Sequence, residues 1–276
     1  MDPQAGNCEL DGWGGAQRAF SDRAGGSLRS TPAIHNFKAD SSLPDTLALM
    51  AAMRLELRPL LSRLGLERRG PWYLGQLGQI RLVAAVSGVG GDRAVETFHR
   101  LADAYSLKKM IHLGFAGGLQ LGVRIGQLME FGWVIDGQGS TIRIGEGVPR
   151  IVDMQDQPSQ HMTLLTCDDI VHSVAQKRQL FERHGAAAVD MESFHVATAA
   201  TERRIPLQVL RVISDDANTV VPAIFSEWSS GDAPLAMAVA RYLAWHPQQV
   251  PMLWRWWRRT HRGDQVLIDA IETRLA

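Results

Sequence analysis

Short apolar segments alternate with helix-like segments from residue 46 to residue 213. The segments TLALMAA (46–52) and PLQVLRVI (206–213) have the composition of buried strands, whereas 57–66 and 93–104 have helical spacing. This alternation predicts an α/β fold, a three-layer α/β/α sandwich around a mixed, mainly parallel central sheet. With 45% apolar side chains among 276 residues, the chain can bury such a core.

Four polar residues each follow a predicted buried strand, and they are Glu56, Ser87, Glu192 and Asp215. Because the carboxyl ends of parallel strands meet at one edge of a sheet, we expect these side chains to share one crevice. Plainer structural roles are open for the acids. Asp190 can cap the helix that follows it, with Glu192 in the first turn, and Glu56 can be an ordinary helix acid.

Two glycine-rich segments flank these positions. SGVGG (87–91) is a strand-to-helix turn that can hold an anion or a polar ligand on backbone N–H groups. It is not a dinucleotide fingerprint, because Arg93 stands where the third glycine would be. GFAGGL (114–119) is predicted to be a loop, and its glycines indicate close approach of the backbone to a neighbour or a ligand.

Charge and cysteine content exclude several classes of function. Lys plus Arg and Asp plus Glu number 29 each, so no net field draws the chain to nucleic acid. Cys8 and Cys167 lie far apart, which argues against a disulfide framework, and His161 and His172 have no partners at metal-ligand spacing. Without a signal peptide or a membrane-spanning segment, we expect a cytoplasmic protein that holds no metal.

Five segments together resemble the nucleoside phosphorylase/nucleosidase superfamily in their order and spacing. They are LMAAMRLELRPLL, SGVG, GFAGGL, VDMES and LRVISD. The chain is most similar to methylthioadenosine/S-adenosylhomocysteine nucleosidases, and from TCDDIV to the tail it is similar to the hopanoid-associated phosphorylases. The resemblance implies cleavage of the N-glycosidic bond of a 5′-substituted adenine nucleoside, such as methylthioadenosine, S-adenosylhomocysteine or an adenosyl lipid like adenosylhopane.

The resemblance also implies roles for individual residues. Asp215 would protonate purine N7, Glu192 would stabilise the ribosyl cation with Met191 against the sugar, and Glu56 would activate water. Ser87 would hold that water or a phosphate oxygen. The remaining positions expected to contact substrate are Gly88, Ala116, Gly117, Ile170, Val171 and Ser214. Relatives commonly place an aromatic residue against the base, where this chain has Asp169, Ile170 and Val171.

Hydrolysis is favoured over phosphorolysis, because the loop after the first strand carries Glu56 and no glycine. Arg54, Arg58 and Arg93 lie near the candidate loops, so phosphate remains a candidate co-substrate, as in a phosphorylase of hopanoid biosynthesis. No other cofactor is expected. An alternative from another class is a non-catalytic nucleoside-binding module on the same fold. The resemblance further implies a homodimer or a larger homo-oligomer.

The two ends of the chain differ in composition from its centre. Residues 1–44 are rich in Gly, Ser, Asp and Arg and are predicted to be a flexible leader, and 45–232 form the predicted catalytic domain. Residues 233–276 are predicted to be a helical, aromatic and basic appendage. Within it, 250–261 can be a helix packed on the sheet or a peripheral contact with the inner face of the membrane.

Overall fold

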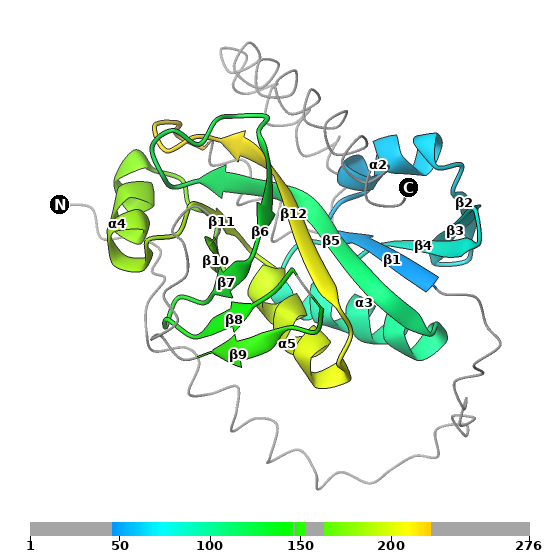
Figure 1. Ribbon diagram of the computed structural model, residues 1–276. Coiled ribbons are helices and arrows are strands. Elements are labelled where there is room, and N and C mark those ends of the chain that lie inside the picture. The colour runs from blue at the N-terminus through cyan, green and yellow to red at the C-terminus, as the bar shows by residue number, and fades with distance from the viewer. Residues whose placement is uncertain (1–45, 146, 153–162, 222–276) are drawn as a thin grey trace, which may run out of the picture. The chain divides into compact units, whose positions relative to one another are not determined.

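The computed structural model describes residues 46–145, 147–152 and 163–221 (Figure 1). The predicted leader (1–44) lies outside these ranges. So do residues 222–232 of the predicted catalytic domain and the predicted appendage (233–276), which includes 250–261. The boundaries assigned to the catalytic domain therefore remain predictions.

The described elements follow one another in the predicted alternation of strands and helices. The helices are α2 (Arg54–Arg63), α3 (Gly91–Ala104), α4 (Val174–His184) and α5 (Ser193–Arg203). The strands are β1 (Thr46–Ala51), β2 (Glu67–Arg69), β3 (Trp72–Leu77), β4 (Ile80–Val86), β5 (Leu107–Gly118), β6 (Leu128–Phe131), β7 (Trp133–Ile135), β8 (Thr141–Arg143), β9 (Arg150–Val152), β10 (Thr163–Thr166), β11 (Ala188–Asp190) and β12 (Leu207–Asp215).

These strands form one mixed sheet in the order β2-β3-β4-β1-β5-β11-β10-β7-β8-β9, with β12 paired to both β5 and β6. The long strands β4, β1, β5 and β12 run parallel to one another, and Leu49 of β1 lies opposite Ala84 and Ile111. Antiparallel pairs join β2 to β3, β3 to β4, β7 to β8 and β8 to β9. The predicted α/β fold with a mixed sheet is confirmed.

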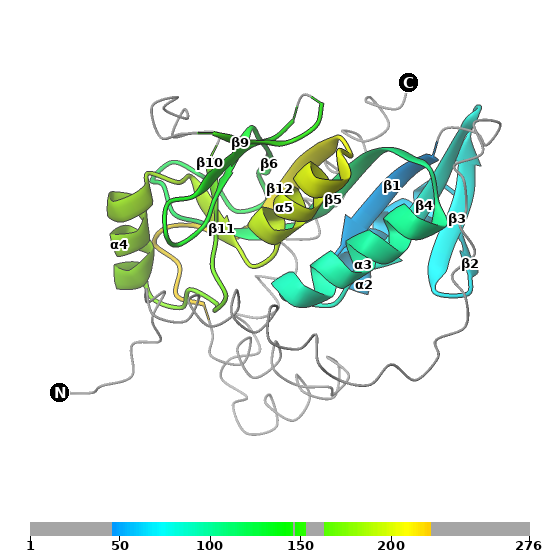
Figure 2. The same ribbon diagram turned by 90° about the horizontal axis from the view of Figure 1, so that it is seen from below.

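Helices cover both faces of the sheet. On one face, α2 buries Leu57 and Leu60 against β1, β4 and β5. On the other face, α3 and α5 lie side by side, and they bury Phe98 and Val196 in a second apolar cluster (Figure 2). A third cluster contains Leu180 of α4 together with residues of β10 and β11. Full burial of such aliphatic side chains stabilises the fold by about 1.5–3 kcal/mol each.

The segment 114–119 differs from its prediction as a loop, because residues 114–118 are the last part of β5. One edge of β5 pairs with β1 as far as His112, and the same edge pairs with β11 at Gly117 and Gly118. The opposite edge pairs with β12 (Figure 1). Along that edge, the pairing with β1 ends at His112 and the pairing with β11 begins at Gly117, so residues 113–116 lie between the two. This opening is where the candidate site lies.

Candidate active site

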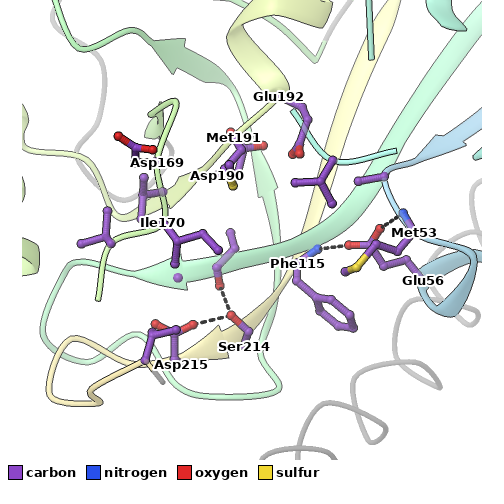
Figure 3. A pocket seen from close by; sticks show the side chains of 17 residues that line it. Met53, Glu56, Phe115, Asp169, Ile170, Asp190, Met191, Glu192, Ser214 and Asp215 are labelled. Carbon is purple, nitrogen blue, oxygen red and sulfur yellow. Dashed lines mark hydrogen bonds between the residues drawn. The ribbon is translucent and has the colours of Figure 1, made fainter. Parts of the chain in front are cut away.

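A pocket lies at the carboxyl ends of β1, β11 and β12, beside the open part of β5 (Figure 3). Nine of the predicted site residues line it: Glu56, Ala116, Gly117, Ile170, Val171, Met191, Glu192, Ser214 and Asp215. The pocket is also lined by residues that were not assigned to substrate: Ala52, Met53, Val89, Phe115, Asp169, Val189, Asp190 and Val221. The structure thus brings the three candidate catalytic acids together from three distant parts of the chain.

Each carboxylate oxygen of Glu56 accepts one backbone hydrogen bond. It is the third residue of α2, where its Oε2 accepts a hydrogen bond from the Met53 N–H at 2.7 Å, as in a capping box. Its Oε1 accepts from the Phe115 N–H at 2.9 Å, in the open part of β5. At Gly114 a Cβ would lie 2.8 Å from Oε1, so the glycine makes room for the carboxylate.

The environment of Glu56 places its titration near neutral pH. Burial raises its pKa to about 7, although the N–H groups of Met53 and Phe115 and the charge of Arg211 act in the opposite direction. A carboxyl group with this pKa is well suited to accept a proton from water at physiological pH.

Glu192 precedes α5 as its N-cap residue, but its side chain makes no capping hydrogen bond to that helix. Instead, Oε1 accepts from the N–H of Gly90, the N-cap of α3, at 3.0 Å. Burial, together with the nearby Asp190 carboxylate, raises the pKa of Glu192 to about 7, although the Gly90 N–H and the charge of Arg211 act in the opposite direction. Glu192 follows the end of β11, and its carboxyl group points into the pocket (Figure 3).

Asp190 is held mainly by a buried ion pair. Its Oδ2 accepts from Arg211 Nη2 at 2.8 Å and from Nε at 3.0 Å, and also from the Ser193 hydroxyl at 2.6 Å. Its Oδ1 accepts from the Thr166 hydroxyl at 2.8 Å and from the Ser193 N–H at 3.3 Å, which is a capping contact at the start of α5. With these hydrogen bonds, Asp190 anchors the end of β11.

Arg211 is a residue that sequence reasoning did not select. It is 1% exposed, and Nη1 donates to the carbonyls of His112 at 3.0 Å and Leu210 at 3.1 Å. Burial and the guanidinium charge hold the pKa of His112 well below its usual range, so this imidazole is neutral. The available signal was a lone arginine in an apolar strand, since a buried charge requires a counter-charge.

Asp215 ends β12 on the opposite side of the pocket from Glu56 (Figure 3). Its Oδ1 accepts from the Ser214 hydroxyl, and its Oδ2 forms an ion pair with Lys177 of α4. A Cβ at Gly117 would lie 3.1 Å from Oδ2, so this glycine also makes room for a carboxylate. Close backbone approach at 114–119 is therefore observed, although the segment is a strand.

Lys177 was also missed by sequence reasoning. It stands in a helix rich in polar residues, where a solvated lysine is the ordinary expectation. The one available signal was its spacing of three residues from Leu180, which places both on one face of α4. That face is buried.

Ser87 and Gly88 are not among the residues that line the pocket. The Ser87 hydroxyl donates to the Gly88 carbonyl at 2.8 Å, and its N–H donates to the Ala51 carbonyl at 2.9 Å. Gly88 has a φ of 87°, and a Cβ there would lie 3.0 Å from Arg93 Cδ. The Ser87 N–H bond joins the turn to the end of β1. The residue that the turn contributes to the pocket is Val89.

The described residues contain no group of three or more His, Cys, Asp or Glu side chains arranged to hold a metal ion. His172 Nδ1 lies 3.1 Å from the Val221 carbonyl, so its contact is with backbone. Among the described helices, none is both long enough and apolar enough to cross a membrane.

Comparison with known proteins places these features in a family. The model of the phosphorylase superfamily matches residues 43–233. An aminodeoxyfutalosine nucleosidase from Helicobacter pylori is 23% identical over an aligned length of 211 residues, and the match covers 66% of this chain and 90% of that protein. A 5′-methylthioadenosine/S-adenosylhomocysteine nucleosidase from Exiguobacterium is 24% identical over 62% of this chain and 85% of that protein.

A solved structure has the same fold. The Helicobacter pylori 5′-methylthioadenosine/S-adenosylhomocysteine nucleosidase, crystallised with butyl-thio-DADMe-Immucillin-A, superposes with a TM-score of 0.59 at 19% identity. The match covers 83% of this chain and 99% of that structure. Since the family model spans most of the chain, including the three strand ends that carry the candidate acids, the chain belongs to the phosphorylase superfamily.

Proposed function

We propose that this protein hydrolyses the N-glycosidic bond of a 5′-substituted adenine nucleoside and releases adenine. The observation that carries the proposal is the convergence of Glu56, Glu192 and Asp215 on one pocket, where two of the acids have pKa values raised to about 7. Nucleosidases among the relatives, which include one named for methylthioadenosine and S-adenosylhomocysteine, support this choice of reaction and substrate.

The arrangement of the acids suggests how a nucleoside would lie. With its base beside Asp215 and the apolar side chains of Ile170 and Val171, the ribose would face Glu192 and Met191. The water would then lie beside Glu56, on the other side of the sugar (Figure 3). Aliphatic contact with the base replaces the aromatic contact that is common in the family.

The reaction proceeds with a balanced transfer of two protons. Asp215 donates its proton to N7 of the purine, and the electron pair of the C–N bond leaves with the base. Glu192, when ionised, stabilises the ribosyl cation that develops. The oxygen of water then bonds to the ribosyl carbon, and its proton passes to Glu56.

Charge in the pocket favours water over phosphate as the acceptor. No lysine or arginine is among the described residues that line it, whereas Glu56 and Glu192 bring negative charge to the ribose side. A phosphate dianion placed there would be repelled by these carboxylates. Arg54, Arg58 and Arg93, which first suggested phosphate, are not among the lining residues.

Adenine release tests the proposal. The purified protein is incubated with methylthioadenosine, S-adenosylhomocysteine or an adenosyl lipid, with and without phosphate, and free adenine is followed by chromatography. We expect release that does not depend on phosphate, and Asp215→Asn should reduce turnover by about 10²–10⁴-fold while substrate still binds. Strict dependence on phosphate would make the protein a phosphorylase. Tight binding without release would make it a binding module.

The adenosyl lipid is the substrate that would give the basic aromatic segment 250–261 a role at the membrane surface. We therefore propose that the full chain binds vesicles containing anionic lipid, and that truncation after Pro247 abolishes this binding. Sedimentation with vesicles measures it. Equal sedimentation of the full and truncated chains would contradict the membrane role without affecting the assignment of the reaction.

A further inference from the structure

Lys177 is fully buried, with 0% of its surface exposed. Its ammonium group has an acceptor for each of its three protons. Nζ donates to Asp215 Oδ2, to the Asp216 carbonyl at 2.7 Å and to the Thr219 carbonyl at 2.9 Å. A buried charge is stable only when it is paired and hydrogen-bonded, and these three acceptors all belong to one turn, 215–219.

The segment that leads into α4 is attached to the same turn at a second point. The Val221 N–H donates to the His172 carbonyl at 2.9 Å, and His172 Nδ1 lies 3.1 Å from the Val221 carbonyl. The Asp216 carboxylate is directed back into the turn, where it accepts from the Thr219 hydroxyl at 2.7 Å. Lys177 is therefore the cation that α4 provides to the Asp215 carboxylate.

We propose that Lys177 is the positioning residue for Asp215, and that its positive charge stabilises the carboxylate that Asp215 becomes when it gives up its proton. This inference rests on the proposed function. When the Asp215 carboxyl gives its proton to the base, negative charge develops beside the buried ammonium, which stabilises that charge. The ammonium keeps all three of its protons. The proton that moves is the one on the Asp215 carboxyl, and solvent replaces it after the base leaves.

Ser214 shows which carboxyl oxygen is available for the proton. Oδ2 accepts from Lys177, so Oδ1 is the oxygen that can be protonated and turned toward a base. In the unprotonated state the Ser214 hydroxyl donates to Oδ1. When Oδ1 carries a proton, the hydroxyl has a second acceptor in the Ala116 carbonyl, 3.2 Å away.

Other titratable groups lie in the pocket or beside the turn 215–219, and their signals must be separated from that of Asp215 in any experiment. Across the pocket lie the buried carboxyl groups of β11, of the start of α5 and of α2, and on the α4 side lie an exposed carboxylate at the rim, a histidine and the turn's second carboxylate. These are Asp190, Glu192, Glu56, Asp169, His172 and Asp216. Asp190 is already paired with Arg211. An infrared band, or a limb of the pH profile of kcat, is therefore assigned to Asp215 only if it is lost in Asp215→Asn.

The first test measures the carboxyl group directly and needs no turnover. Infrared difference spectra recorded against pH contain a carbonyl band for each protonated carboxyl, and the Asp215 band is the one that Asp215→Asn removes. In Lys177→Met, we expect this band to persist to a pH about 1–3 units higher than in the natural chain, because the nearby positive charge is gone. An unchanged titration of the band would overturn the proposal, whatever the activity of the protein.

The second test uses the pH dependence of adenine release. In Lys177→Met, kcat should fall, and the alkaline limb of the kcat profile should move to higher pH by the same amount as the infrared band. Lys177→Arg, which keeps the charge, should keep the alkaline limb in place. A loss of kcat with an unmoved limb in Lys177→Met would reduce Lys177 to a merely structural role and contradict the proposal.

Arg178→Met provides the matched control. Arg178 is the next residue of α4, and its Nε donates to Glu182 at 2.8 Å on the exposed side of the helix. In Arg178→Met, we expect the alkaline limb of the kcat profile, the value of kcat and the infrared titration to be those of the natural chain. Thermal unfolding establishes that each variant is folded before comparison, and if Lys177→Met is unfolded, Lys177→Gln takes its place. If the natural chain releases no adenine, the proposed function fails, while the infrared test still decides the role of Lys177.

Discussion

At the scale of single residues, Glu56 combines a structural and a chemical contact. One oxygen caps α2 and the other lies at the open edge of β5. In Glu56→Gln, the amide oxygen can still accept from Met53, but the amide nitrogen cannot accept from Phe115 or take a proton from water. We expect kcat for adenine release to fall by about 10²–10⁴-fold, with a loss of stability of only about 0.5–2 kcal/mol.

Steady-state kinetics and urea unfolding measure the two effects of Glu56→Gln. Arg54→Gln, an exposed change on the same helix, is the control, and it should leave both kcat and stability nearly unchanged. A loss of kcat smaller than tenfold in Glu56→Gln would show that Glu56 only caps the helix.

Glu192 makes stability depend on pH in a defined direction. Its pKa is raised from 4.5 to about 7, so the folded state binds a proton more tightly than the unfolded state does. The stabilisation by the protonated form is fully present below about pH 4.5 and is lost as pH rises through about 7. Glu192→Gln removes this dependence. As the pH rises from 4 to 8, the free energy of unfolding of the variant should therefore increase by roughly 1–3 kcal/mol relative to that of the natural chain.

Urea unfolding at pH 4, 6 and 8 measures this difference. Glu202→Gln, an exposed change near the end of the same helix, should follow the natural chain at each pH. Glu56 titrates in the same pH window, and its charge raises the pKa of Glu192, so the difference between the two proteins includes the interaction between these two carboxyl groups. Parallel curves for Glu192→Gln and the natural chain would refute the buried, uncharged state of Glu192 at low pH.

At the scale of elements, β5 positions the site because its glycines leave space for the acids. A Cβ at Gly114 would lie 2.8 Å from Glu56 Oε1 and 3.6 Å from Arg211 Nη1. Gly114→Ala should therefore displace the Glu56 carboxylate, lower kcat at least tenfold and cost about 1–3 kcal/mol of stability.

Gly132→Ala is the matched control for Gly114→Ala. Gly132 lies between β6 and β7, and a Cβ there meets nothing within 4 Å. Kinetics and unfolding of the two alanine variants should differ sharply. If Gly114→Ala keeps normal kcat, then the position of Glu56 is not critical for the reaction.

The same element explains what the sequence could and could not predict. The strand ends that carry Glu56, Glu192 and Asp215 were predicted because apolar runs mark buried strands, and parallel strands align their ends. The extent of β5 was not predicted, because glycines ordinarily interrupt strands, and here they continue one to make room for side chains from elsewhere. Lys177 and Arg211 were missed because their burial depends on partners brought in by the fold.

At the scale of the whole molecule, the pair of Arg211 and Asp190 joins the parts of the sheet that meet at the site. Arg211 on β12 contacts His112 of β5, Asp190 of β11 and Ser193 of α5. Its charge also lowers the pKa of Glu56 and that of Glu192. The stability of the fold and the charge of the pocket therefore depend on the same buried cation.

Arg211→Met tests this coupling in one protein. Removing the cation leaves Asp190 buried without its counter-charge, which should cost about 3–5 kcal/mol. The acid limb of the kcat profile follows the ionisation of Glu56 and Glu192. Because Arg211 lowers the pKa of both, this limb should move to higher pH in Arg211→Met. Arg203→Met, which breaks only the exposed pair with Asp103, should lose less than about 1 kcal/mol.

Adding Asp190→Asn to Arg211→Met separates the two consequences of losing the cation. The double variant no longer buries an unpaired charge, so it should regain part of the lost stability in urea unfolding. Asp190 also raises the pKa of both glutamates, so its neutralisation should move the acid limb back toward lower pH. A double variant that is no more stable than Arg211→Met would mean that Arg211 stabilises the fold through its packing and its carbonyl contacts rather than through its charge.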